Sequence, residues 1–116
     1  MNHTPLEFRN IIKSIGKKGG LEILLSLKNG AKKWIFLENT VKDKQAVSHR
    51  LREFLNLGLI QITIIHDTPT GSKAYELTPL GKKIVKHIEE MEKEFREYHK
   101  GLPKGRKFIE EVLEED

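Results

Sequence analysis

Residues 40–80, TVKDKQAVSHRLREFLNLGLIQITIIHDTPTGSKAYELTPL, decide the fold of this chain. The stretch opens with a polar, basic pattern of helical period and continues with two strand-like runs around a turn. It closes on the start of a new helix. Together with further helical patterns on both sides, this order predicts a mainly α protein with a small β-hairpin (α+β).

The segment from Asp43 to Leu57 is predicted to be a helix with two different faces. Asp43 can cap it. Apolar residues at helical spacing form the face expected to be buried, and these are Val47, Leu51, Phe54 and Leu55. The opposite face carries side chains suited to base edges and phosphates, namely Lys44, Gln45, Ser48, His49 and Arg52. A solvated amphipathic helix would show the same polar face, so this segment alone leaves both interpretations open.

A hairpin is predicted directly after this helix. Leu59 to His66 and Lys73 to Leu77 are strand-like because they are rich in β-branched and aromatic residues. Residues 67–72, DTPTGS, have the composition of a turn. Thr78 and Pro79 then provide the cap and the first position of the next helix.

Three shorter helices are predicted before residue 40. Thr4 and Pro5 mark the start of the first, which Gly16 ends. Residues 19–30 run from a Gly-Gly pair to an Asn-Gly stop and are apolar on nearly every side, so we expect this helix to be the most buried. Ala31 to Glu38 is short enough to be the first helix of a helix-turn-helix pair.

Two segments at the appropriate separation, VSHRLREFLNLGLI (47–60) and YELTPLGKKI (75–84), resemble winged helix-turn-helix transcriptional regulators of the MarR and HxlR types. They match the end of the recognition helix and the exit from the wing. The resemblance covers about residues 20–85. It implies a winged-helix core at 20–80. The length of 116 residues suits a single domain over 1–116.

The resemblance also implies DNA-binding residues. The segment from Asp43 to Leu57 would read the major groove of double-stranded DNA, with Lys44, Gln45, Ser48, His49 and Arg52 as contacts. The wing, His66 to Lys73, would touch an adjacent minor groove or the backbone through Ser72 and Lys73. The tip of this wing offers only Lys73 among small polar residues, fewer cations than such wings often carry.

Residues 81–116 are expected to form C-terminal helices and a dimerisation region. A 4-3-4-3 spacing of apolar residues makes a narrow, coiled-coil-like seam of Ile84, Ile88, Met91, Phe95 and Tyr98. Its partner is either the first helix of the same chain or the same helix of a second subunit, and we expect a homodimer. Gly101 and Pro103 should end the helix, and a short terminal helix is predicted to carry Phe108 to Leu113.

Composition and charge agree with a DNA-binding protein. Residues 1–78 hold 12 Lys and Arg against 7 Asp and Glu, a net charge of +5, whereas residues 79–116 hold 9 against 10, a net charge of −1. The longest apolar run, Leu59 to Ile65, is far below the roughly 20 residues that span a bilayer, and the first residues show no secretory signal. We therefore expect a cytoplasmic protein with no membrane contact. The Lys- and Glu-rich composition suggests a thermophilic or archaeal source.

Motifs for catalysis, metals and cofactors are not visible in the sequence. Without cysteine there is no disulfide framework, thiolate zinc site or cysteine nucleophile. The five histidines include no metal-binding pair at helical spacing, and no phosphate-binding glycine motif occurs. We expect no enzyme, no metal and no cofactor.

Two other functions stay open because a fold alone does not determine function. Winged helices also serve as protein–protein interaction modules in transcription, replication or chromosome complexes, here through the neighbourhood of Trp34 or Phe54. A ligand-responsive repressor would bind a small-molecule effector between the DNA-binding part and the dimer helices. The sequence names no such ligand.

Overall fold

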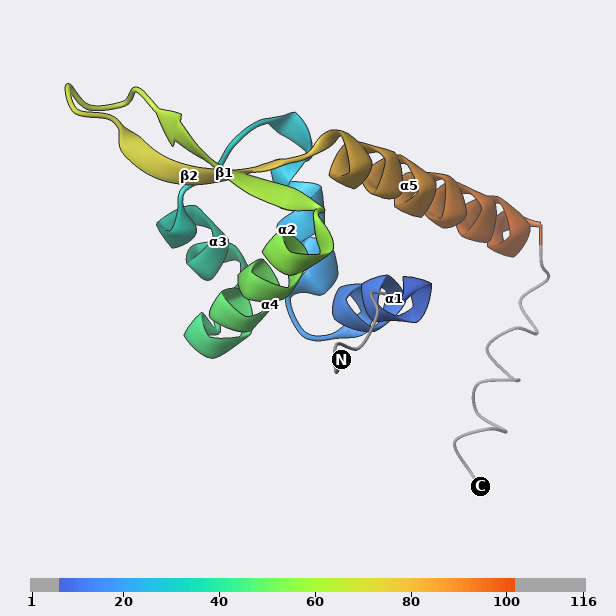
Figure 1. Cartoon of the computed structure of the whole chain (residues 1–116). Coiled ribbons are helices and arrows are strands. Elements are labelled where there is room, and N and C mark those ends of the chain that lie inside the picture. Colours follow the sequence, from blue (N-terminus) through green and yellow to red (C-terminus); the bar gives the residue numbers. More distant parts are fainter. Residues whose placement is uncertain (1–6, 102–116) are drawn as a thin grey trace, which may run out of the picture. The chain divides into compact units, whose positions relative to one another are not determined.

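A computed structural model describes residues 7–101 of the chain (Figure 1). Its elements in chain order are α1 (Phe8–Gly16), α2 (Gly20–Ser26), the short 3-10 helix η1 (Leu27–Asn29), α3 (Trp34–Val41), α4 (Lys44–Leu57), β1 (Ile60–Ile65), β2 (Ser72–Leu77) and α5 (Pro79–Lys100). This order confirms the predicted winged helix-turn-helix with added terminal helices. The chain divides into two compact units, Met1–Val85 and Lys86–Asp116, and the division falls within α5.

Two helices begin later than the sequence indicates. Glu7 precedes α1 in an extended conformation, so the helix starts at Phe8 and not at Pro5, which lies outside the described residues. The predicted helix start at Ala31 is also wrong. The backbone of Lys32 exchanges two hydrogen bonds of 2.9 Å with that of Tyr75, and this bridge to β2 delays α3 until Trp34. Sheet pairing with a distant residue has overridden the local helical pattern here.

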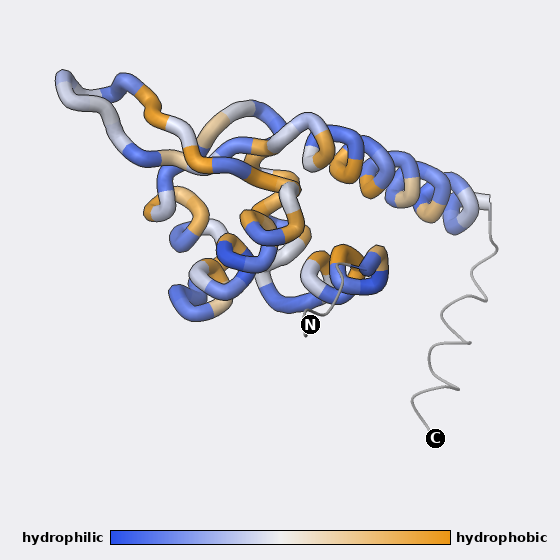
Figure 2. The backbone as a smooth tube through the Cα atoms, in the orientation of Figure 1, coloured by the Kyte–Doolittle hydropathy of each residue, from blue (hydrophilic) through white to orange (hydrophobic). Residues whose placement is uncertain are grey.

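The core of the first unit is built from one side of α2, α3 and α4, from η1, and from the hairpin and the start of α5. Figure 2 shows the hydropathy of these segments along the backbone. In α2, Ile23 and Leu24 are fully buried, while Leu21 and Leu25 are partly exposed. The segment predicted to be apolar all round therefore buries only one side. The other core residues are Leu27, Leu37, Ala46, Val47, Leu51, Phe54, Leu59, Ile60, Ala74, Tyr75, Leu77 and Val85.

The hairpin is a regular antiparallel pair that extends away from α3 and α4 (Figure 1). Its register pairs Ile60 with Leu77 and Ile65 with Ser72. Gly71 closes the turn with a φ of 81°, a conformation that favours glycine, and its N–H donates to the carbonyl of Thr68 at 3.0 Å. In β1 only Ile60, at the root of the wing, is buried, and the residues from Gln61 to Ile65 are exposed or half-buried.

The end of α4, the root of the wing and the start of α5 are joined at Thr78. Its hydroxyl donates to the carbonyl of Gly58 at 2.6 Å and accepts from the N–H of Gly81 at 3.0 Å. The second bond caps α5 as predicted. A Cβ atom added at Gly81 would overlap the carbonyl oxygen of Leu59, so only glycine allows the helix to approach the strand this closely.

Candidate nucleic-acid interface

Helix α4 has a buried face and an exposed polar face. Val47 and Phe54 are fully buried, Leu51 is buried, and Leu55 is half-buried, which agrees with the predicted stripe. The residues predicted to contact DNA are all exposed, and these are Lys44, Gln45, Ser48, His49 and Arg52. The sequence pattern therefore identified correctly which face of this helix meets solvent.

The exposed side chains of α4 have no partners in the described part of the chain. Within residues 7–101, none of these five side chains forms a hydrogen bond or an ion pair. Their donors and acceptors are available to a ligand. Ser48 and Arg52 also border a shallow notch of about 250 Å³, whose other walls are Trp34, Leu51, Leu55 and Tyr75.

A polar network that the sequence did not reveal holds the back of α4. Arg50 is only 7 % exposed, and its Nη2 donates to Glu53 at 3.2 Å. Its Nε lies 3.0 Å from the other carboxylate oxygen of Glu53, an ion pair without hydrogen-bond geometry. The hydroxyl of Ser14 donates to Oε1 of Glu53 at 2.8 Å, and the ammonium group of Lys17 donates to Oε2 of Glu53 at 3.3 Å. Burial raises the pKa of Glu53, but the hydrogen bonds from Ser14 and Lys17 and the charge of Arg50 outweigh it, so the pKa is lowered.

The network fixes α4 against α1 from behind. Arg50 also reaches the carbonyl oxygen of Lys18 at 3.5 Å, in the turn between α1 and α2. Only its position beside the buried stripe distinguishes Arg50 from the exposed Arg52 in the sequence. The structure therefore excludes Arg50 from the exposed face of this helix.

The beginning of α4 is capped as predicted. The carboxylate of Asp43 accepts from the N–H of Ala46 at 3.0 Å, and Lys18 lies 3.0 Å from its second oxygen. The bond from Ala46, followed by the bond from Lys18, lowers the pKa of Asp43. Lys42 precedes the cap in a left-handed conformation with a φ of 62°, which forms the turn of the helix-turn-helix.

The two predicted wing contacts are placed differently from those on α4. The hydroxyl of Ser72 donates to Asp67 at 2.6 Å, so its proton is already used within the wing. The second oxygen of Asp67 accepts from Lys33 at 2.7 Å. Lys73 is exposed, with its ammonium group 5.5 Å from the centre of the Tyr75 ring. The wing therefore presents fewer available donors than its sequence suggests.

The apolar seam lies along α5. Ile84 and Ile88 are half-buried, whereas Met91, Phe95 and Tyr98 are 62 %, 58 % and 66 % exposed. Three large apolar side chains are therefore exposed on one helix, and a partner could cover such a surface. The helix ends at Lys100 with Gly101 in a turn, as predicted, and the terminal helix predicted around Phe108 lies outside the described residues.

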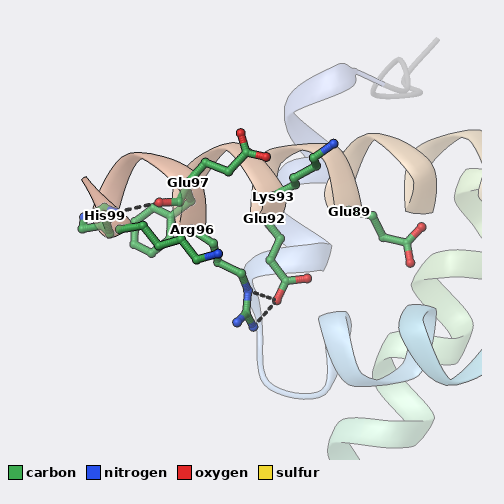
Figure 3. Close-up of a pocket in the computed structure, with 8 residues that line it drawn as sticks. Glu89, Glu92, Lys93, Arg96, Glu97 and His99 are labelled. Carbon is green, nitrogen blue, oxygen red and sulfur yellow. Dashed lines mark hydrogen bonds and ion pairs between the residues drawn. The ribbon is translucent and has the colours of Figure 1, made fainter. Parts of the chain in front are cut away.

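Figure 3 shows a hollow along the C-terminal half of α5, with the Glu92–Arg96 ion pair (2.8 Å) beside it. Its lining residues are Glu89, Glu92, Lys93, Phe95, Arg96, Glu97, His99 and Lys100. All of them belong to one helix. Because a single helix cannot enclose a ligand, we assign no binding site to this hollow.

Residues 7–101 contain neither a candidate metal site nor a candidate membrane span. No group of three or more His, Cys, Asp or Glu side chains is arranged to hold a metal ion. No helix in this range combines the length and the apolar character needed to cross a membrane.

Comparison with known proteins identifies the family. A model of the HxlR-like helix-turn-helix matches residues 14–102, and the chain belongs to this family. Its members are transcriptional regulators that bind DNA, and the protein is therefore a DNA-binding transcriptional regulator. The sequence resemblance to MarR and HxlR regulators is confirmed. A search of curated proteins found no match.

Several solved structures share this fold. One is described as a transcriptional regulator of the MarR family from Enterococcus faecalis V583, with 18 % identity, a TM-score of 0.68 and coverage of 86 % of this chain and 96 % of that chain. The reduced form of the transcriptional regulator YodB from B. subtilis has 22 % identity, a TM-score of 0.62 and coverage of 78 % and 89 %. A transcriptional regulator, ytfH, from Salmonella typhimurium has 17 % identity, a TM-score of 0.61 and coverage of 92 % and 88 %.

Proposed function

We propose that this protein is a sequence-specific regulator that binds double-stranded DNA as a homodimer, with α4 in the major groove. The observation that supports it most is the exposed face of α4. Five polar side chains without partners in residues 7–101 lie on a helix that Arg50 and Glu53 fix from behind. A rigid helix with available donors is what base reading requires, because base edges discriminate only when the donors are held in place.

The roles of these side chains differ along the helix. Gln45, Ser48 and His49 are short or planar groups in the first turns of α4, and we assign them to base edges. Lys44 and Arg52 are long cations at the borders of this face, and we assign them to phosphates. At the wing, Lys73 is the remaining candidate for a backbone contact.

DNA binding itself is tested by its dependence on salt. The observed association constant for a random duplex should fall steeply between 50 and 200 mM salt, because each phosphate contact releases counterions. Selection from a random DNA pool should then return an enriched sequence. An association constant that does not depend on salt, or a selected pool without an enriched sequence, would contradict the proposal.

The homodimer rests on the exposed seam. Besides Met91, Phe95 and Tyr98 on α5, helix α1 exposes Phe8 and Ile12. Phe95→Glu should convert a sedimenting dimer into a folded monomer, because Phe95 is exposed within the chain and its loss leaves no cavity. Lys93→Glu on the same helix, outside the seam, is the control and should leave the dimer intact. A wild-type protein that sediments as a monomer at tens of micromolar contradicts the proposal.

A two-fold dimer also predicts the form of the operator. Two recognition helices related by a two-fold axis should select an inverted repeat with half-sites about 10 base pairs apart. A footprint over a single half-site, or a direct repeat, would contradict this geometry. A cytoplasmic location follows from the DNA-binding proposal, and a small-molecule effector stays a prediction without a named site.

If the protein is instead a protein-interaction module, the burial of its aromatic side chains limits which residues can form the contact surface. Phe54 is fully buried and Trp34 is half-buried, so Phe54 cannot form an adhesive face. The exposed apolar side chains on α3 are Ile35 and Phe36. If DNA binding fails the salt test, these two residues are the place to probe for a protein partner.

A further inference from the structure

Asp67 is the most heavily engaged side chain of the wing. One carboxylate oxygen accepts from the hydroxyl of Ser72 at 2.6 Å and the other from the ammonium group of Lys33 at 2.7 Å. Lys33 directly precedes α3 and lies 34 positions earlier in the chain. The hydrogen bond from Lys33, followed by that from Ser72, lowers the pKa of Asp67, so the carboxylate is ionised at neutral pH.

The ion pair between Lys33 and Asp67 contributes little to stability, but it changes which charged groups near the wing are available to DNA. Both side chains remain more than one-third exposed, and ion pairs at such sites contribute little to folding. A lysine neutralised by an aspartate gains less from a phosphate, because it must first give up its carboxylate. Once released, that carboxylate would face the negatively charged backbone.

We propose that Asp67 is a specificity-determining residue, which holds Lys33 and Ser72 and thereby keeps Lys33 from making a sequence-independent phosphate contact. This inference rests on the proposed DNA-binding function. A larger share of the binding energy then comes from the base-reading residues of α4, and a smaller share from contacts that every DNA sequence offers. Asp67 acts on DNA only through Lys33 and Ser72, so it is a positioning residue.

The test replaces the charge while keeping the shape. Asp67→Asn should raise affinity for a random duplex by roughly three- to tenfold at low salt and steepen the salt dependence by about one counterion. The ratio of affinities for selected and random DNA should fall. Glu76→Gln is a matched control, because it removes one negative charge from the same hairpin, where Glu76 accepts from Gln61 and from no cation among residues 7–101.

A double-mutant cycle with Lys33→Ala assigns the cause. If Lys33 is the withheld contact, Asp67→Asn should leave the salt dependence unchanged in the Lys33→Ala background. An equal effect in both backgrounds, or the same effect from Glu76→Gln, overturns the inference, since charge alone would then explain it. Loss of affinity for both DNAs in Asp67→Asn also overturns it, because the ion pair would then support DNA binding.

The failure of this inference is distinct from that of the proposed function. Wild-type protein that binds no DNA removes both. Wild-type protein that binds with a steep salt dependence, combined with an unaltered Asp67→Asn variant, removes only the role of Asp67.

Discussion

Helix α4 and the wing both carry polar side chains, but those on the exposed face of α4 have no partners in residues 7–101, whereas Ser72 in the wing has one. Each element is held by a carboxylate from within the chain. Glu53 holds α4 from its back, and the donors on its front have no partners in residues 7–101. Asp67 accepts from Ser72 within the wing and from Lys33 before α3, so these two donors already have a partner. The position of the internal ion pairs on an element therefore decides which of its hydrogen-bond donors are available to a ligand.

The largest effect on stability is expected at the junction of α5 with the root of the wing. Gly81→Ala should lower the free energy of unfolding by on the order of 3 to 5 kcal/mol, because the new methyl group would overlap the carbonyl oxygen of Leu59. Urea unfolding measures the loss. Gly16→Ala is the control, since a Cβ there meets nothing within 4 Å and its cost should be close to zero. Equal stability of the two variants would show that this junction is not tightly packed.

The tether on the back of α4 is tested by Glu53→Gln. Removing the charge should cost about 1 to 3 kcal/mol at neutral pH, because the nearly buried Arg50 loses its ionic partner. The folded-state pKa of Glu53 is lowered from its ordinary value of 4.5, so its contribution is complete above that pH and is lost as pH falls through the folded-state pKa. Unfolding measured at a series of pH values should show the difference between the two proteins shrinking as the pH falls below 4.5. A constant difference across that range would assign the loss to packing.

The front of α4 is tested first at Gln45. Gln45→Ala should cost on the order of 1 to 3 kcal/mol at one base pair and relax the sequence preference there, because glutamine can pair bidentately with adenine. Binding to a set of single-base variants of the selected site measures this. Equal loss of affinity for selected and random DNA would move Gln45 from the base-reading group to the phosphate group.

A smaller and more uniform effect is expected at Arg52. Arg52→Ala should weaken binding to all sequences alike and lower the salt dependence by about one counterion, because the variant loses one phosphate contact. Titrations with selected and random duplexes at several salt concentrations measure both quantities. A change confined to one base position would make Arg52 a base-reading residue. If neither Gln45→Ala nor Arg52→Ala affects binding, the recognition role of α4 fails.

Local sequence patterns were sufficient to predict the order of the elements and which face of α4 is exposed. Apolar residues at helical spacing, the cap at Asp43 and the Thr78–Pro79 helix start act over a few residues, so the local pattern was enough to predict them. The same pattern separated Lys44, Gln45 and Arg52 from the buried side of the helix.

Contacts between distant segments set which polar groups remain available and where α3 begins. Ser14 meets Glu53 across 39 positions, Lys33 meets Asp67 across 34, and the backbone of Lys32 pairs with that of Tyr75. Local sequence patterns cannot predict such contacts, because they form only when folding brings distant segments together. The sequence therefore shows which face of α4 is polar, whereas the fold decides that Arg50 is buried and that Ser72 already has a partner.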